Sequence, residues 1–399
     1  MFNPTTGERA LAYTTPILEI KPITITNSEG KEIPLLDKDG KPYDKIEKAR
    51  VGGWWCVVKK DEFKVGDLAV YFEIDSGVPE KPVYEFLRSR KFRIRTMKLC
   101  GGLILSQGLL LRLEDVLPKN YDFSSLTENV DLTDLLEVKK YEPEEFYGKV
   151  PIHIGSAKGK FPSDIRKTDE DRVQNLTGII SKLPFTYEVT EKLDGMSTTI
   201  FYKNTSSQLE NGLIEITPTI GLCSRNLELK YEPKYREEES HPMGQFWETL
   251  YKTNLDEKIK QVCFETGRQL AFQGELLGPG ICKNRYELDD FEILIFKIWD
   301  IDNKKYLLPS ERQNICKKYN IPHVPFIFLE FEWIFCDDDV PNMVQTLLEM
   351  AERKTIFGKN LNKNIEGLVF KHLTEDFSFK VISNSYLLEL EEILKKKKK

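Results

Sequence analysis

The chain has 399 residues, more than one ordinary hydrophobic core holds, and this length predicts two or three domains. Its hydrophobic content of 40% and charged content of 31% are ordinary for a soluble globular protein. No apolar run is long enough to span a membrane, and the N-terminus has no apolar signal core. We therefore expect an intracellular protein, cytoplasmic or nuclear, with no membrane partner.

The seven cysteines are scattered and form no CxxC pair, which argues against structural zinc and against a disulfide framework. The net charge of −6 disfavours nucleic acid as a partner on a global count. Local patches decide such binding, however, so the charge distribution has to be read along the chain.

The first ~130 residues are predicted to be rich in short strands. Trp54–Lys59, Leu68–Phe72 and Leu103–Leu110 are apolar or aromatic segments, and glycines such as Gly52 and Gly53 mark the turns between strands. Short strands separated by glycine turns are typical of a small barrel. We place this β-rich domain at residues 1–140.

A strongly basic run, RSRKFRIRTMK, occupies residues 88–98. If it forms an extended strand, one face is cationic and the other packs inward. The candidate contacts to nucleic acid in this run are Arg90, Lys91, Arg93 and Arg95. A solvated edge strand that prevents aggregation is the alternative interpretation.

A charged, proline-containing segment within residues 138–165 predicts a linker, and a second domain follows at 150–399. Apolar spacing predicts helices over Phe246–Cys263 and Val340–Ala351. Strands are expected at five further segments: Tyr187–Lys192, Leu270–Leu276, Ile293–Ile298, Gly367–Lys371 and Phe377–Ile382. The second domain is therefore expected to be α+β.

Five short motifs with chemically useful side chains follow one another in this second domain. They are Glu191-Lys192-Leu193-Asp194-Gly195, Ser224-Arg225-Asn226, Gly274-Glu275-Leu276-Leu277-Gly278, Glu366-Gly367-Leu368-Val369-Phe370-Lys371 and Ser378-Phe379-Lys380. Each motif alone is a weak signal: Lys192-Leu193-Asp194-Gly195, for example, can occur by chance in any large protein, where its lysine is simply exposed. Their order is the informative feature.

In this order the motifs resemble the covalent nucleotidyltransferase superfamily of RNA ligases, DNA ligases and capping enzymes. The nearer resemblance is to ATP-dependent nick-sealing RNA ligases of the Deinococcus and Naegleria type. It rests on these motifs, on Arg172-Val173-Gln174-Asn175 and on Phe296-Lys297-Ile298-Trp299-Asp300, and it covers nearly the whole chain. It implies an OB-like barrel followed by an α+β nucleotidyltransferase domain, an ATP-grasp-like ligase domain, with antiparallel sheets.

The resemblance also implies the roles of individual residues. Lys192 is expected to attack ATP and to carry AMP. The expected substrate is RNA with 3′-hydroxyl and 5′-phosphate ends at nicks in duplexes. The enzyme is expected to be a monomer. The other catalytic groups are Lys380 and Arg172. ATP and AMP are expected to contact Glu191, Gly195, Arg225, Glu275, Phe296, Lys371 and Lys380. A hydrated Mg²⁺ or Mn²⁺ is expected to be held by Asp194, Glu275 and Glu366.

The chemistry demands an uncharged amine, so the site has to lower the pKa of Lys192 from its usual value near 10.4. One departure from the family pattern is visible: related enzymes often carry K-x-K in the last motif, whereas Ser378 stands in the first position here. Lys371 is the candidate to fill that place. The alternatives are a DNA ligase, a capping guanylyltransferase, and a non-catalytic nucleic-acid-binding protein.

Overall fold

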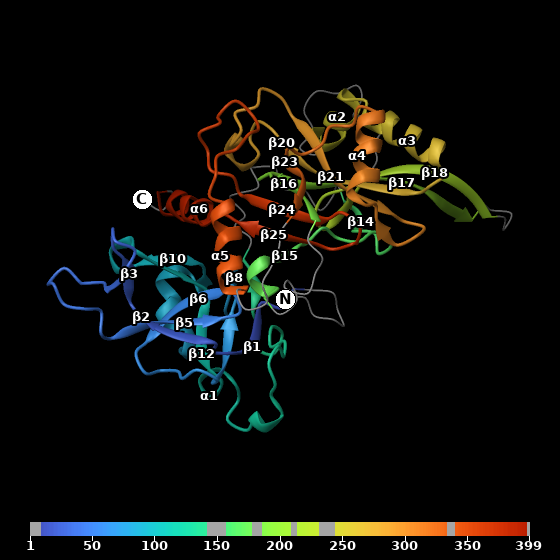
Figure 1. The fold of residues 1–399 in the computed structure, drawn as a ribbon. Helices are drawn as coiled ribbons and strands as arrows, with labels where there is room; N and C mark the ends of the chain where they lie inside the picture. The colour runs from blue at the N-terminus through green and yellow to red at the C-terminus, as the bar shows by residue number, and fades with distance from the viewer. Residues whose placement is uncertain are drawn as a thin grey trace.

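The structure is a computed structural model that describes residues 9–141, 157–177, 186–208, 214–230, 244–332 and 340–396. The N-terminal part, blue to cyan in Figure 1, lies beside a larger green-to-red part that holds the long strands. The fold is α+β, as expected from the sequence.

The N-terminal part is built from short strands in several small antiparallel sheets. They are β1 (Ala12–Pro16), β2 (Glu19–Pro22), β3 (Thr24–Thr26), β4 (Glu32–Pro34), β5 (Ile46–Val51), β6 (Trp54–Lys59), β7 (Leu68–Phe72), β8 (Ser76–Gly77), β9 (Arg93–Ile94), β10 (Thr96–Leu99), β11 (Ile104–Gln107), β12 (Leu109–Arg112) and β13 (Lys139–Lys140). The main sheets have the orders β1-β7-β12 and β2-β5-β6. Short helices η1 (Pro82–Arg90), η2 (Cys100–Gly102), α1 (Leu113–Val116) and η3 (Phe123–Ser125) connect them.

Two sequence predictions for this part need correction. The expected strand Leu103–Leu110 is divided into β11 and β12, because Gly108 adopts a φ of +98° between them. The expected extended strand through Lys91 is wrong: residues up to Arg90 form η1, and Lys91 and Phe92 both have positive φ, 53° and 56°. The alternation that would give one cationic face is therefore absent from the described run.

The larger part contains a seven-stranded and a five-stranded sheet. The seven-stranded sheet has the order β14-β19-β18-β17-β20-β21-β22. Its strands are β14 (Ala157–Lys160), β17 (Met196–Gln208), β18 (Ile214–Cys223), β19 (Leu227–Leu229), β20 (Leu270–Leu277), β21 (Glu292–Asp300) and β22 (Lys305–Tyr306). The five-stranded sheet has the order β15-β25-β24-β16-β23, with β15 (Asp171–Arg172), β16 (Thr186–Lys192), β23 (Phe326–Glu332), β24 (Gly367–His372) and β25 (Ser378–Ile382). Its pairings are antiparallel except that β15 runs parallel to β25.

The helices of this part are α2 (Gly244–Lys252), α3 (Leu255–Thr266), α4 (Pro309–Lys318), α5 (Val340–Met350) and α6 (Asn384–Lys396), with short turns η5 (Val173–Asn175) and η8 (Cys282–Asn284). The predicted helix Phe246–Cys263 is in fact α2 and α3, because Asn254 has a φ of 52° between them. Both pack on the seven-stranded sheet, and α5 packs on the five-stranded one. No helix in the described ranges is long and apolar enough to cross a membrane.

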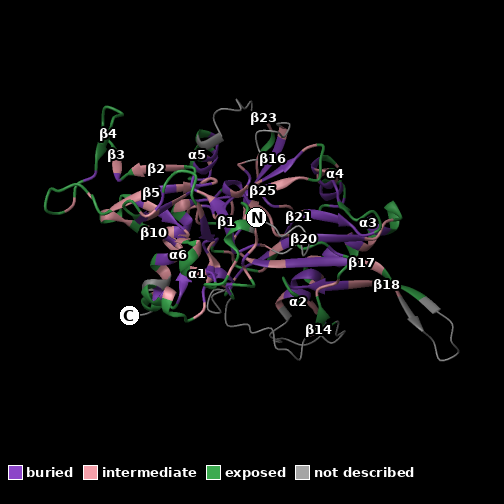
Figure 2. Cartoon of the chain, turned by 90° about the horizontal axis from the view of Figure 1, so that it is seen from below, coloured by how far each residue is buried: buried purple, intermediate pink, exposed green. Residues whose placement is uncertain are grey.

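Helix α6 joins the two parts of the molecule. It follows β25 directly, yet Tyr386 and Leu387 belong to the same buried cluster as Trp54 and Tyr71 of the N-terminal part. In Figures 1 and 2, α6 lies beside β10 of that part, and contacts between the two elements agree. The C-terminal helix therefore completes the N-terminal core.

Candidate active site

The most distinctive motif, Lys192–Gly195, lies at the connection between β16 of the five-stranded sheet and β17 of the seven-stranded sheet. Strand β16 ends at Lys192, and β17 begins at Met196 in the seven-stranded sheet. Lys192 is paired in register with Gly367 of β24, which follows Glu366. As a result, the Lys192 amine donates a hydrogen bond to Glu366 at 2.8 Å.

The backbone of this crossover lies very close to β20. The amide of Gly195 donates to Glu275 at 3.1 Å, and the amide of Asp194 donates to the Tyr286 hydroxyl at 2.8 Å. A Cβ added to Gly195 would lie 2.6 Å from the carbonyl oxygen of Leu276, so a side chain does not fit there. Glycine at this position is what allows Lys192, Asp194 and Glu275 to approach one another.

Three carboxylates surround the amine, and burial together with the repulsion between them raises the pKa of two of them, Glu275 and Asp194. Burial, opposed by Lys192 and assisted by Glu366, raises the pKa of Glu275 to about 8. Burial and Glu366 raise the pKa of Asp194 to about 6. For Lys192, burial lowers the pKa, but Glu366 and Glu275 outweigh it and raise the pKa above its usual value.

The raised pKa of Lys192 differs from the sequence expectation, and the three carboxylates are the reason. Among the residues that the structure describes, no three Asp, Glu, His or Cys side chains are close enough together to hold a metal ion directly. Carboxylates that repel one another around one position fit a cation that keeps its waters, because a hydrated cation takes oxygen acceptors and lowers that repulsion. Asp194, Glu275 and Glu366 therefore suit an outer-sphere metal site.

The five-stranded sheet also presents cations on the face that carries Lys192. Lys380 of β25 pairs with Val369, and Val369 in turn pairs with Thr190. The Lys380 amine lies 3.1 Å from Asp169, and Arg225 lies 3.7 Å from the same carboxylate. Burial lowers the pKa of Lys380 to about 8, although Asp169 opposes this shift.

Lys371, expected to replace the missing lysine of the last motif, is paired in register with Ser378, which stands in that lysine's place. It pairs with Glu188, four residues before Lys192, which corresponds to about 13 Å along the strand. It is buried and contacts Thr190 at 2.8 Å and Glu188 at 3.3 Å, while Glu188 also pairs with Arg312. The structure does not bring Lys371 beside Lys192.

Lys297 of β21 is the cation that contacts Ser378, and sequence reasoning missed it. Its amine donates to the Ser378 hydroxyl at 2.7 Å and lies 2.5 Å from Glu170. Asp169 thus forms an ion pair with Lys380, and Glu170 forms one with Lys297. The acidic run TDED at residues 168–171, directly before Arg172, was the signal for these contacts.

Of two candidate nucleotide contacts, Phe296 lies near the connection between β16 and β17, whereas the Glu191 side chain points to other partners. Phe296 is half-buried and packs against the cluster that contains Leu193, the residue after Lys192. The Glu191 side chain is buried and accepts hydrogen bonds from the Thr355 hydroxyl at 2.5 Å and the Ile356 amide at 3.0 Å. Phe296 therefore lies near the crossover, whereas the Glu191 side chain is occupied elsewhere.

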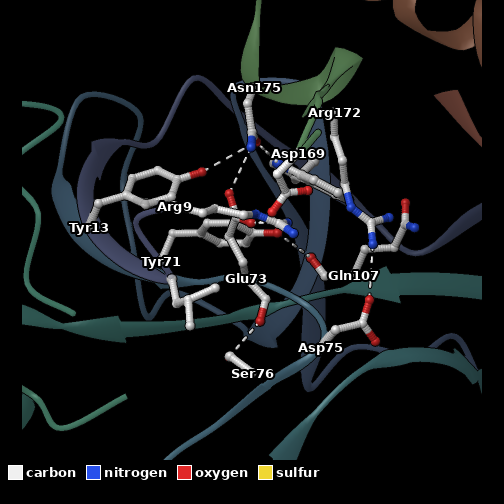
Figure 3. A network of polar contacts seen from close by, with 12 residues as sticks. Arg9, Tyr13, Tyr71, Glu73, Asp75, Ser76, Gln107, Asp169, Arg172 and Asn175 are labelled. Atoms are coloured by element: carbon white, nitrogen blue, oxygen red, sulfur yellow. Dashed lines mark hydrogen bonds and ion pairs between the residues drawn. The ribbon is translucent and has the colours of Figure 1, made fainter. Parts of the chain in front are cut away.

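Arg172 takes part in a polar network between the two parts of the molecule (Figure 3). Its guanidinium lies 2.9 Å from Asp75, and it is buried. Nearby, Asn175 donates to Glu73 at 2.7 Å and accepts from the Trp54 indole at 2.7 Å, and Glu73 also pairs with Arg9. Arg172, a candidate catalytic residue, is thus held by a carboxylate of the N-terminal part.

Two of the four basic residues predicted to contact nucleic acid, Arg93 and Arg95, are engaged in ion pairs within the protein. Arg93 is buried and lies 3.0 Å from Glu391 of α6, and Arg95 pairs with the same carboxylate. Arg90 is half-buried and Lys91 is exposed. Arg93 and Arg95 therefore fasten α6 to the N-terminal part.

Comparisons with known proteins agree with this architecture. The RNA ligase family matches residues 185–382, and an OB-fold domain matches residues 38–113. A lysine-to-methionine variant of Naegleria gruberi RNA ligase with AMP and Mn is 32% identical, with a TM-score of 0.74, covering 96% of this chain and 99% of that chain. A lysine-to-alanine variant with ATP and Mn is 33% identical, with a TM-score of 0.73, covering 95% and 98%. The Naegleria gruberi RNA ligase with PPi is 33% identical, with a TM-score of 0.73, covering 96% and 99%. No curated protein matches the chain.

Proposed function

The chain belongs to the family of ATP-dependent RNA ligases of the Naegleria type, and from this premise we propose that Lys192 is the nucleophile that carries AMP. The observation that carries the proposal is the position of the Lys192 amine, 2.8 Å from Glu366 and beside Glu275 and Asp194. Relatives bound to ATP or AMP with Mn support ATP and a divalent cation as the cofactors.

Three transfers complete the reaction. The Lys192 amine attacks the α-phosphorus of ATP, the bond to the β-phosphate breaks, and pyrophosphate leaves. A 5′-phosphate oxygen of RNA then attacks the same phosphorus and displaces the lysine. Finally the 3′-hydroxyl attacks the 5′-phosphate, a phosphodiester forms, and AMP leaves.

The first transfer requires Lys192 to lose its proton. The neighbouring carboxylates hold the amine in its charged form, so their negative charge has to be compensated before the amine can attack. A hydrated divalent cation held by Asp194, Glu275 and Glu366 would supply that compensation. Glu366, as acceptor of the Lys192 hydrogen bond, orients the amine.

Basic side chains near Lys192 are our candidates to contact the phosphates. Lys380 is our candidate for the α-phosphate contact, with Arg225 beside the same carboxylate, Asp169. Arg172 supports this group from the neighbouring strand, since it pairs in register with Lys380. Phe296 is our candidate to stack on adenine, because it is half-exposed next to Leu193.

We also propose that the substrate is nicked duplex RNA. The ligase would work as a monomer inside the cell, because ATP and RNA are available there. Residues 1–140 would form the OB-type domain and residues 150–399 the nucleotidyltransferase domain. Arg90 and Lys91, which are not engaged by Glu391, remain candidates for RNA contact.

Transfer of label from ATP tests the assignment. Wild-type protein freed of nucleotide should form a covalent AMP adduct with ATP and Mg²⁺ or Mn²⁺, but not with GTP. Peptide mapping should place the adduct on Lys192, and Lys192→Ala should form none. An adduct on another residue, or an equal adduct with GTP, would contradict the proposal.

A further inference from the structure

The outer face of the sheet β2-β5-β6 differs in character from its inner face. Residues alternate along these strands, so that Ala49 and Val51 of β5 and Trp54 and Cys56 of β6 point into the N-terminal core. The residues between them point outward and are half-buried, and β2 and β5 are drawn mostly in the intermediate colour in Figure 2.

One aromatic ring on this outer face is surrounded by three cations. Arg50 pairs in register with Trp55. The Arg50 guanidinium carbon lies 6.0 Å from the centre of the Trp55 ring, and the amines of Lys21 and Lys48 lie at 5.6 and 5.5 Å. The carboxylate of Glu19 pairs with Arg50 at 2.9 Å and Lys21 at 2.8 Å.

The balance of charge here is positive, although the chain as a whole is acidic. Three cations meet two carboxylates here, Glu19 and Glu32, of which Glu32 acts on Lys48, whereas the net charge of the chain is −6. Burial lowers the pKa of Lys48, which means that the charged form of this amine is destabilised in the cluster. By contrast, Arg93 pairs with both Glu391 and Asp75, and Arg95 pairs with Glu391. A polyanion laid across the outer face would relieve the repulsion between the three cations.

The sheet that carries this face also contacts the catalytic part of the molecule. The turn between β5 and β6 contacts it directly, because the Gly53 amide donates to the carbonyl of Gln174 at 2.9 Å. Gln174 is two residues from Arg172. Trp55 is only two residues past Gly53 on β6, so a strand bound on this face would pass close to the junction of the two parts.

We propose that the outer face of β2-β5-β6 binds the phosphodiester backbone of the RNA substrate through Lys21, Lys48 and Arg50, with Trp55 stacking on a base. Basic side chains that neutralise phosphates and an aromatic ring that stacks on a base together are the usual means of binding nucleic acid strands without sequence specificity. The site deepens the ligase function proposed above and rests on it.

The test measures RNA binding and AMP transfer separately. Binding of a fluorescent nicked RNA duplex with a blocked 3′ end is followed by anisotropy over a range of salt concentrations. Lys21→Glu with Lys48→Glu should weaken binding at least tenfold and lower the slope of log K against log salt by about two, because about 0.9 is lost per phosphate contact. Trp55→Ala should weaken binding about 5- to 100-fold, and Trp55→Phe should retain most of it.

A control of equal charge change is Lys119→Glu with Lys317→Glu, since both side chains are exposed and lie elsewhere. Both double variants should form the AMP adduct at the wild-type rate. Wild-type affinity and salt slope in the Lys21 and Lys48 variant would overturn the proposed face, while the adduct still upholds the ligase function. If Trp55→Ala unfolds, the charge reversals decide, because their side chains do not enter the core.

Discussion

Loss of the Asp75 carboxylate should destabilise the junction between the two parts by about 3 kcal/mol. Arg172 is 6% exposed, and its Nε and Nη1 atoms have no hydrogen-bond partner among the described residues, so Asp75 at 2.9 Å is its closest compensating charge. Removing one partner of a buried pair costs about 3–5 kcal/mol. The Asp75 side chain is 27% exposed, which places the expected loss at the lower end of that range.

Urea unfolding of Asp75→Asn, followed by tryptophan fluorescence, measures this loss, since the Arg172 guanidinium lies 5.8 Å from the Trp54 ring. Arg172→Met and the double variant complete a mutant cycle that isolates the pair. The matched control is Glu85→Gln, which removes an exposed partner of Arg88 in the same part of the molecule and should change little. If Asp75→Asn is as stable as the control variant, Arg172 is compensated by other groups and the reasoning fails.

Three further changes test the interior of the site. Gly195→Ala should abolish AMP transfer, because its Cβ would lie 2.6 Å from a backbone oxygen, whereas Gly159→Ala, with open space around it, should leave the transfer rate unchanged; equal rates would contradict the close approach. Burial raises the pKa of Glu188, but Lys371 and Arg312 outweigh it and lower the pKa from 4.5 to about 2. Up to about 3 kcal/mol of stability should therefore be present above pH 4.5 and lost as the pH falls toward 2. Acid unfolding of Glu188→Gln should lack that loss. Chelation of divalent cations should stop adduct formation on Lys192, and Glu366→Gln should need a higher metal concentration for half-maximal rate.

Two strands of the catalytic part were predictable from their apolar residues: Tyr187 and Val189 alternate with polar residues in one, and Leu270, Ala271 and Phe272 open the other. Tyr187–Lys192 and Leu270–Leu276 agree with β16 and β20 to within one residue. The break between α2 and α3 was not predictable from apolar spacing, since it depends on Asn254 adopting a left-handed conformation inside a periodic segment.

The candidate site was predictable in its center and not at its edges. Lys192 and Glu366 each belong to a recognisable sequence motif, and the register of β16 and β24 brings them together. The hydrogen-bond donor to Ser378 depends instead on how the two sheets face each other: it is Lys297 of β21, while Lys371 is the register partner of Ser378 on β24. The basic run at 88–98 misled for a related reason: charge is local in sequence, but Glu391, which neutralises Arg93, lies about 300 residues away.

The same long-range contacts decide which experiments can separate the roles of the two parts. Ile382 and Leu387 follow the last motif, yet they are buried in one cluster with Trp54 and Tyr71 of the N-terminal part. Deleting the first 140 residues would expose that apolar surface next to Lys380 and would remove the carboxylate that holds Arg172. A truncated chain that lost ligation would therefore not reveal whether RNA binding or the catalytic strands had failed. Because the side chains on the outer face of β5 lie outside this shared core, single substitutions there can separate the two.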